Sequence, residues 1–211
     1  MNRTVFFDKV RDLLFKGSMK QSQVDGLNFI IDQWNETGFT NRQWLAYALA
    51  TAFHETAFTM QPIREFGRGK GKKYGTTYYG RGYVQLTWLV NYRKASQHLG
   101  IDFVKNPDLV MDPENAAYIM FQGMADGWFT GKEFADYIND KQRDYWNARR
   151  IINGTDKAGA IADYAIKFEA ALDAAAVAAG APKPIPAPTP PEQTDSLLWR
   201  VILAIWRLIT N

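Results

Sequence analysis

Apolar residues recur at the spacing of an α-helix through the first quarter of the chain, and this periodicity constrains the fold most strongly. It predicts three amphipathic helices. The third is expected to begin near Asn41, because Thr40 followed by Gln43 resembles a capping box, and to end near Thr56. The windows with this spacing are residues 6–14, 24–34 and 45–53.

The composition changes between residues 67 and 82, where glycine, lysine, arginine and tyrosine replace the apolar repeat. We predict a loop with a small hairpin, built from one or two short strands within residues 74–86 and a tight connection at residues 80–82. The pattern as a whole predicts a mainly α fold of the α+β type with a minor β element. Further helices are predicted at residues 88–99, from Asp112 onwards, at 143–152 and at 157–179.

Six prolines between residues 182 and 191 cannot continue a helix and predict an extended spacer. The chain of 211 residues is therefore divided into three parts. We expect a single folded domain at residues 1–180, a Pro-rich linker at 181–194 and an apolar or amphipathic helix at 195–211.

The C-terminal segment is almost wholly apolar between residues 197 and 209, and carries Trp199, Arg200, Trp206 and Arg207. It is too short to span a bilayer, which needs roughly 20 residues, so we expect these four side chains to contact a membrane interface. The alternative is a helix that docks on the folded domain or on a second copy of the chain.

Composition removes several classes of site. There is no cysteine, and the two histidines are His54 and His98, so neither a disulfide framework nor a thiolate metal site is available. The segment that follows His54 is not a zinc-peptidase helix, because Phe58 stands where the second histidine would be. We expect no metal and no cofactor.

The net charge of +3 is concentrated between Arg64 and Arg81, where six basic residues accompany the single acid Glu65. A polyanionic partner fits this bias, and nucleic acid, an anionic wall polymer and a membrane surface fit it equally well. Residues 1–11 lack the pattern of a secretory signal peptide, so synthesis in the cytosol is expected.

Catalysis by carboxylate side chains is the class of chemistry that remains, and Glu55 is the first candidate for a general acid. It follows Leu49, Ala52 and Phe53 at the end of a predicted buried helix. A partly desolvated carboxyl group is protonated more readily and can act as a general acid. The alternative is a solvated glutamate at a helix end, the commoner situation for this residue type.

Four blocks of sequence, in order, resemble glycoside hydrolase family 19, which contains chitinases and related phage endolysins. The resemblance implies a lysozyme-like fold with a helical body and a small β region bordering a cleft. It also implies an inverting glycosidase without a metal, in which Glu55 is the acid. The blocks are AFHET at 52–56, YGRGYVQLT at 79–87, NY at 91–92 and IING at 151–154.

Glu65 is the candidate second carboxylate, because it is the only acidic residue between Glu55 and Asp102. The alternative is a surface charge paired with Arg64 or Arg68. By correspondence with the family, Gln85 and Asn91 hydrogen-bond sugar groups, and Asn153 binds substrate or water. Thr87 takes the place of a serine that orients the attacking water.

Each of these assignments has a structural alternative. Thr87 could cap the following helix, and Asn153 before Gly154 is typical of a helix C-terminus. Tyr79 either stacks on a sugar or fills the hairpin. His54 is expected to be a packed, hydrogen-bonded neighbour that orients the loop.

Two departures from the family pattern matter. The family commonly has an arginine after the Asn-Gly block that joins the charge network of the acid, and residues 154–191 contain none. Lys157 or Lys167 could replace it. The chain also lacks the disulfide-stabilised loops of plant chitinases, which favours a phage-type enzyme.

These features together predict a monomeric endolysin: a muramidase that hydrolyses the glycan strands of bacterial peptidoglycan, using Glu55 as acid and Glu65 as base. We expect no nucleic-acid partner. The enzyme would be made in the host bacterial cytoplasm and act on the wall after release. Three alternatives remain: a chitinase, a lytic transglycosylase, and a membrane-active protein that works through its C-terminal helix.

Overall fold

The structure, a computed structural model, describes residues 1–181. The predicted linker beyond Ala181 and the predicted tail helix, with Trp199, Arg200, Trp206 and Arg207, lie outside the described residues. The helices are α1 (Arg3–Leu14), α2 (Gln21–Glu36), α3 (Arg42–Glu55), α4 (Leu89–Leu99), α5 (Pro113–Ala125), α6 (Phe134–Tyr137) and α7 (Ala158–Val177), with 3₁₀ helices η1 (Pro107–Met111) and η2 (Asn147–Ile151). The strands are β1 (Ile63–Arg64), β2 (Arg81–Gly82), β3 (Ile138–Asn139) and β4 (Gln142–Arg143).

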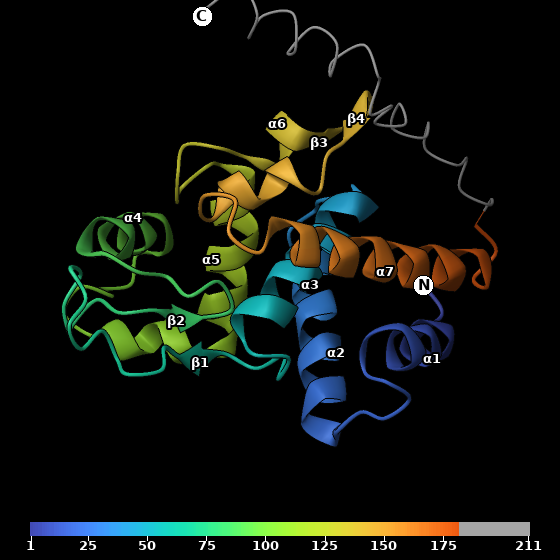
Figure 1. Cartoon of the computed structure of the whole chain (residues 1–211), viewed down its shortest axis with the longest axis horizontal. Helices are drawn as coiled ribbons and strands as arrows, with labels where there is room; N and C mark the ends of the chain where they lie inside the picture. Colours follow the sequence, from blue (N-terminus) through green and yellow to red (C-terminus); the bar gives the residue numbers. More distant parts are fainter. Residues whose placement is uncertain (182–211) are drawn as a thin grey trace, which may run out of the picture.

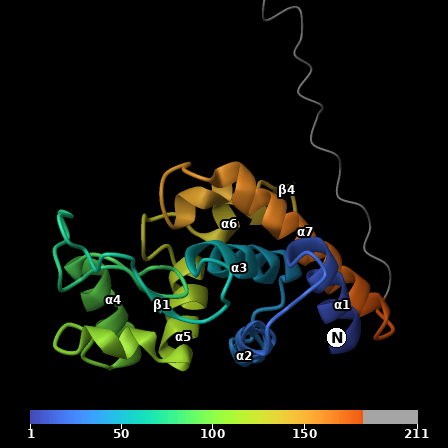
Figure 2. The ribbon, with the colours of Figure 1, turned by 60° about the horizontal axis from the view of Figure 1, so that its bottom comes forward.

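Helix α3 lies at the centre of the molecule (Figure 1). Nine consecutive residues, Leu45–Phe53, are buried, so this helix is covered on all sides. It packs most extensively on α7, which also packs on α1, while α2 contacts α3 and α5. The turned view shows α4, α5 and the β1 strand on one side of α3 and α1 on the other (Figure 2).

A buried carboxylate fixes α7 against its neighbours. Glu169 accepts hydrogen bonds from Gln43 at 3.0 Å, from Arg143 at 2.8 and 2.9 Å and from the hydroxyl of Tyr145 at 3.1 Å. A buried charge is tolerated when it is paired and hydrogen-bonded. These bonds join α3, the β4 region and α7 into one rigid body around the core.

Local capping explains where several helices begin and end. The third helix begins as predicted, but its cap is Asn41 rather than Thr40: the Asn41 side chain accepts from the backbone N–H groups of Gln43 and Trp44. Asp112 caps α5 in the same way. Gly100 ends α4 with a φ of +69°.

A short strand lies within residues 74–86 as predicted, but the predicted tight connection at residues 80–82 is wrong. Antiparallel pairs join Ile63 to Gly82 and Arg64 to Arg81, so Arg81 and Gly82 form β2, and residues 65–80 form the long connection. Arg81 also pairs with Leu86 in an isolated antiparallel bridge. The buried Arg81 accounts for this arrangement, because its guanidinium donates to Asp108 and to the hydroxyl of Tyr92 and holds the segment inside the molecule.

The helix predicted at residues 143–152 is reduced to η2. Asn139 accepts from the backbone N–H groups of Lys141 and Gln142 and closes the turn between β3 and β4. Asp144 then accepts from the N–H of Asn147, which sets the start of η2. Side-chain caps of this kind compete with a continuous helix. Helix α6 and strands β3 and β4 were not predicted.

The described part of the chain is thus mainly helical with a few short strands, as predicted. No helix within residues 1–181 is long and apolar enough to cross a membrane.

Candidate active site

Glu55 is the last residue of α3, and its side chain is held by an ion pair. Arg149 donates from Nη1 to Glu55 Oε1 at 2.7 Å, and the two side chains are 5% and 15% exposed, respectively. Arg149 also donates from Nε to the carbonyl of Asp156 at 3.1 Å. Among residues 1–181, no side chain or backbone group donates to Glu55 Oε2, so this oxygen is free to face a substrate.

Arg149 takes the place that the sequence assigned to a lysine. Lys167 is bonded to Asp163 on the surface of α7, and Lys157 is exposed at the start of that helix. The arginine comes from η2, before the Asn-Gly block rather than after it. Its apolar neighbours Ala148 and Ile151 were the available signal, because they mark a segment that packs into the core.

Asn153 and His54 lie beside this pair. The Asn153 N–H donates to the carbonyl of Arg149 at 3.0 Å, and its side chain accepts from Gly154 and is exposed. His54 is half-buried, and burial lowers its pKa. Its ring centroid lies 6.5 Å from that of Tyr164, and in the described region its side chain makes no hydrogen bond, contrary to the expectation.

Glu65 follows β1 and is held by two hydrogen bonds. Its Oε1 accepts from the hydroxyl of Tyr74 at 2.6 Å, and its Oε2 accepts from the N–H of Gly80 at 3.0 Å. It is not paired with Arg64, which binds Asp108 instead, or with Arg68. Burial and the bond to Glu65 raise the pKa of Tyr74 to about 12, so its hydroxyl stays a donor at neutral pH.

The segment between β2 and α4 lies against Glu65. An added Cβ on Gly80 would lie 2.8 Å from Gln85 Oε1, so a larger residue at position 80 would displace the end of the Gln85 side chain. Gln85 donates to the carbonyl of Ile63 at 3.1 Å. Thr87 donates to the carbonyl of Gln85 at 2.6 Å and leaves the helix uncapped.

Asn91 and Trp88 complete this segment. Asn91 donates to the carbonyl of Thr87 at 2.9 Å, which fixes the start of α4. Trp88 is about half exposed and meets the ring of Tyr74 edge-on at 5.4 Å. Tyr74 therefore links the two segments: its hydroxyl bonds to Glu65, and its ring contacts Trp88, which follows Thr87.

Backbone strain concentrates around these residues. Eight non-glycine residues within 1–181 have positive φ angles, and five of them follow Glu55 or flank Thr87. Such conformations cost about 1–3 kcal/mol each and cluster at functional sites. The five are Ala57, Phe58, Met60, Gln85 and Trp88.

Tyr79 fills the loop and does not present its ring. It is 5% exposed, and the Arg81 guanidinium lies 3.7 Å from the centre of its ring. Its carbonyl accepts from Arg81 and from the hydroxyl of Tyr92. The structure therefore supports the packing alternative for Tyr79 over stacking on a sugar.

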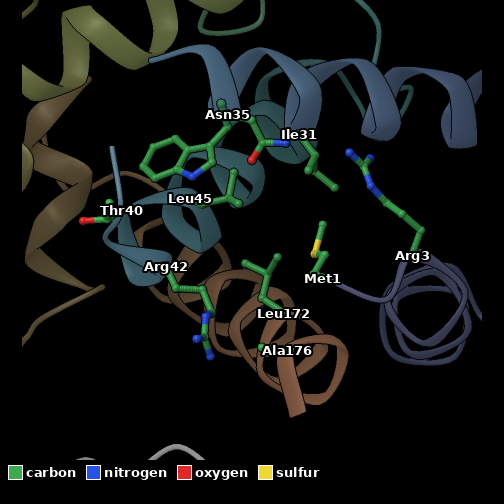
Figure 3. Close-up of a pocket in the computed structure, with 10 residues that line it drawn as sticks. Met1, Arg3, Ile31, Asn35, Thr40, Arg42, Leu45, Leu172 and Ala176 are labelled. Carbon is green, nitrogen blue, oxygen red and sulfur yellow. The ribbon is translucent and has the colours of Figure 1, made fainter. Parts of the chain in front are cut away.

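A metal site and a separate cavity do not account for the function of Glu55 and Glu65. In the described part of the chain, no group of three histidine, aspartate or glutamate side chains could hold a metal. A cavity of about 420 Å³ is lined by residues that include Asn35, Arg42 and Leu172 (Figure 3). Arg42 begins α3 and Glu55 ends it, about 20 Å away at about 1.5 Å per residue, so this cavity is not the candidate active site.

Comparison with known proteins decides the family. The model of chitinase class I, the domain of glycoside hydrolase family 19, matches residues 36–160, more than half of the chain, and this range includes Glu55, Glu65, Arg149 and Asn153. The chain belongs to glycoside hydrolase family 19.

Similar proteins occur in plants. Chitinase 11 of Oryza sativa subsp. japonica is 31% identical over 144 residues, which cover 57% of this chain and 55% of that protein. Basic endochitinase B of Arabidopsis thaliana is 41% identical over 58 residues (28% and 16%), and inactive chitinase-like protein 1 of Hevea brasiliensis is 56% identical over 36 residues (17% and 12%). The chain thus spans 12–55% of the length of these three relatives.

Solved family 19 structures share the fold. A bacterial family 19 chitinase superposes with a TM-score of 0.51 at 22% identity, over 81% of this chain and 94% of that one. Chitinase C from Streptomyces griseus HUT6037 gives 0.51 at 19% identity, over 87% and 78%. At these identities the likeness supports the lysozyme-like family 19 fold and nothing finer.

Proposed function

We propose that this family 19 protein is an endolysin that hydrolyses the glycan strands of bacterial peptidoglycan, with inversion at the anomeric carbon. One observation carries the proposal: two carboxylates on separate segments, Glu55 and Glu65, are each held in a fixed orientation by their own partners. Inverting glycosidases need such a pair about 6.5–9.5 Å apart, with room for a water between them.

Glu55 would act as the general acid. Arg149 engages only Oε1, so the proton can be carried on Oε2 while Oε1 keeps its hydrogen bond. The protonated oxygen then donates to the bridging oxygen of the glycosidic bond as that bond breaks. The hydrogen bond from Arg149 holds the carboxyl group in one orientation in both its protonated and its ionised form.

Glu65 would act as the general base. It takes a proton from a water that attacks the opposite face of the sugar ring. The hydroxyl proton of Thr87 is used in the bond to Gln85, so its oxygen remains free to accept from that water. Tyr74 and Gly80 keep Glu65 oriented during the reaction.

The chain has no cysteine and so lacks the disulfide-stabilised loops of plant chitinases, which favours a compact phage-type enzyme over a plant chitinase. A muramidase is our first choice of activity. The names of the relatives favour a second candidate, a chitinase that acts on N-acetylglucosamine polymers.

A membrane role for residues 195–211 is a separate proposal. Trp199, Arg200, Trp206 and Arg207 give this segment the composition of an interfacial helix. We propose that it brings the enzyme to a bacterial membrane surface next to the wall, and that it is not needed for cutting.

The deciding experiment digests purified peptidoglycan and chitin with the wild type, Glu55→Gln and Glu65→Gln, and identifies the fragments by mass and by their reducing ends. Reducing muramic-acid ends that both substitutions abolish would support the two-carboxylate muramidase. Anhydro ends would indicate a transglycosylase, and an active Glu65→Gln that still gives reducing ends would mean that the base is a different residue. Cutting of chitin alone would select the chitinase, and an active Glu55→Gln would refute the assigned acid.

A further inference from the structure

The connection between β1 and β2 carries a group of free cations next to Glu65. These four residues, Arg68, Lys70, Lys72 and Lys73, are exposed, and none of them forms an ion pair within the described residues. In contrast, Arg64 and Arg81 at the ends of the connection are both paired with Asp108. We name the group the basic loop; its members are Arg68, Lys70, Lys72 and Lys73.

Consecutive turns give the basic loop a defined shape. The N–H groups of Lys70, Lys72 and Gly75 donate to carbonyls three residues earlier, each at 3.0 Å. Gly69 lies so close to Gly75 that an added Cβ would be 2.1 Å from its carbonyl oxygen. Because the loop folds back on itself, its backbone brings the four basic residues together at one edge of the molecule, and this segment lies beside α4 (Figure 1).

The basic loop is tied to the proposed catalytic base at both ends. The Arg68 N–H donates to the carbonyl of Glu65 at 3.1 Å, and Tyr74, just after the last lysine, donates to the Glu65 carboxylate. A glycan strand whose scissile bond lies at Glu65 therefore passes next to these cations. A membrane or a nucleic acid bound here would cover the site.

The candidate polymers differ in charge. Chitin is a neutral chain, whereas muramic acid residues in peptidoglycan carry peptide stems with free carboxylates. We propose that the basic loop binds the peptide-stem carboxylates of the strand being cut and so selects peptidoglycan over chitin. This inference rests on the proposed function, because it concerns the substrate of the same site. Opposite charges at such a surface add affinity and specificity.

The test measures binding by the full chain carrying Glu55→Gln, which keeps the polymers uncut. The polymers are peptidoglycan sacculi, glycan strands freed of stems by an amidase, and chitin. Adding Lys70→Gln, Lys72→Gln and Lys73→Gln should raise the Kd for sacculi about tenfold in low salt, because exposed pairs are individually weak but act together. The Kd for stem-free strands and chitin should change by less than about twofold, and in about 1 M salt the difference for sacculi should vanish.

A matched control replaces three exposed lysines elsewhere, with the same change in net charge. Lys9→Gln, Lys16→Gln and Lys141→Gln lie on α1, just after α1 and in the turn between β3 and β4. This variant should bind sacculi as tightly as its parent. An equal rise in the Kd for sacculi in the control would show that the effect depends only on net charge, and this would overturn the proposal.

Three other results would also overturn it. The first is an unchanged Kd for sacculi in the basic-loop variant. The second is an equal rise in its Kd for stem-free strands. The third is a loss of binding only to vesicles of anionic phospholipid, which would make the loop a membrane-binding surface. Failure of the proposed function is distinguishable, because it appears as an absence of reducing ends in wild-type digests and leaves these binding measurements unaffected.

Discussion

Arg149 is the side chain on which the orientation of Glu55 depends. It is almost fully buried, it gives Glu55 its one hydrogen bond within residues 1–181, and it is itself held by the carbonyl of Asp156. The position of the proposed acid is therefore set by a residue 94 positions further along the chain.

Arg149→Gln should impair both catalysis and stability. Loss of an oriented acid typically costs about 100-fold in kcat, and breaking a buried ion pair costs about 3 kcal/mol of unfolding free energy. Steady-state kinetics and urea denaturation measure the two effects. Arg150→Gln is the control, because the Arg150 side chain is exposed and, within residues 1–181, bonds only to Asn147. Similar losses in both variants would contradict the role given to Arg149.

Tyr74→Phe tests the second carboxylate. It removes the hydroxyl donor to Glu65 and keeps the aromatic contact with Trp88, so kcat should fall about tenfold while the melting temperature changes little. Because the pKa of Tyr74 is raised to about 12, wild-type kcat should show no loss attributable to this hydroxyl below about pH 10. An unchanged kcat in Tyr74→Phe would separate Glu65 from the chemistry.

At the scale of elements, the ion pairs around Asp108 anchor the β1–β2 unit to η1. Arg64 and then Arg81 hold the pKa of Asp108 below its ordinary value of 3.8. A lowered carboxyl pKa contributes stability above the ordinary value, and this contribution is lost as the pH falls through the lowered one. The anchor therefore weakens only in acid.

Asp108→Asn should lower the unfolding free energy by about 1 kcal/mol at pH 6, since Asp108 is largely exposed and Arg81 keeps other acceptors. The difference from wild type should shrink as the pH falls below about 4. Urea denaturation across this range measures it. Asp163→Asn, which breaks an exposed pair with Lys167 on α7, should cost about 0.5 kcal/mol or less. If the difference in unfolding free energy between Asp108→Asn and wild type persisted at low pH, it would not come from the ion pairs of Asp108, and this would refute their stabilising role.

Two helical glycines should respond in opposite directions. Gly26 of α2 lies against the segment after α3, where an added Cβ would be 2.0 Å from the carbonyl oxygen of Met60, so Gly26→Ala should destabilise the fold by several kcal/mol. Gly159 of α7 has open space, so Gly159→Ala should stabilise it by about 0.5–1 kcal/mol. Thermal melting of both variants checks the pair.

The long helices were predictable because each carries apolar residues at helical spacing. Helices α1 and α2 each have one apolar face, whereas α3 is buried on all sides and was recognisable from its continuous apolar sequence. The short elements were not, because side-chain caps such as those of Asn139 and Asp144 determine them. In the candidate site, Glu55 and Glu65 stood out as carboxylates. Their partners did not, since the Arg149 contact joins residues far apart in sequence and no pattern along the chain records it.

For the whole molecule, a chain that ends at Pro191 should keep the melting temperature of the full chain and its rate on purified peptidoglycan. The core of the described residues and every proposed catalytic and sugar-binding residue lie within residues 1–181. It should lose killing of intact cells if residues 195–211 deliver the enzyme to a membrane. Colony counts and turbidity assays on the same preparations separate the two effects, and a lower melting temperature would favour a tail that docks on the domain.

The burial of α3 along nine consecutive residues has a consequence for how the enzyme fails. Glu55 lies at the end of a buried helix, which we expect to unfold only when the whole domain unfolds. Glu65 and the basic loop lie in surface turns, which unfold locally at a much smaller free energy. Warming should therefore release the base long before the acid. The enzyme would lose activity while its helices are still native. It would regain activity on cooling, because the loop would refold against the intact helical body.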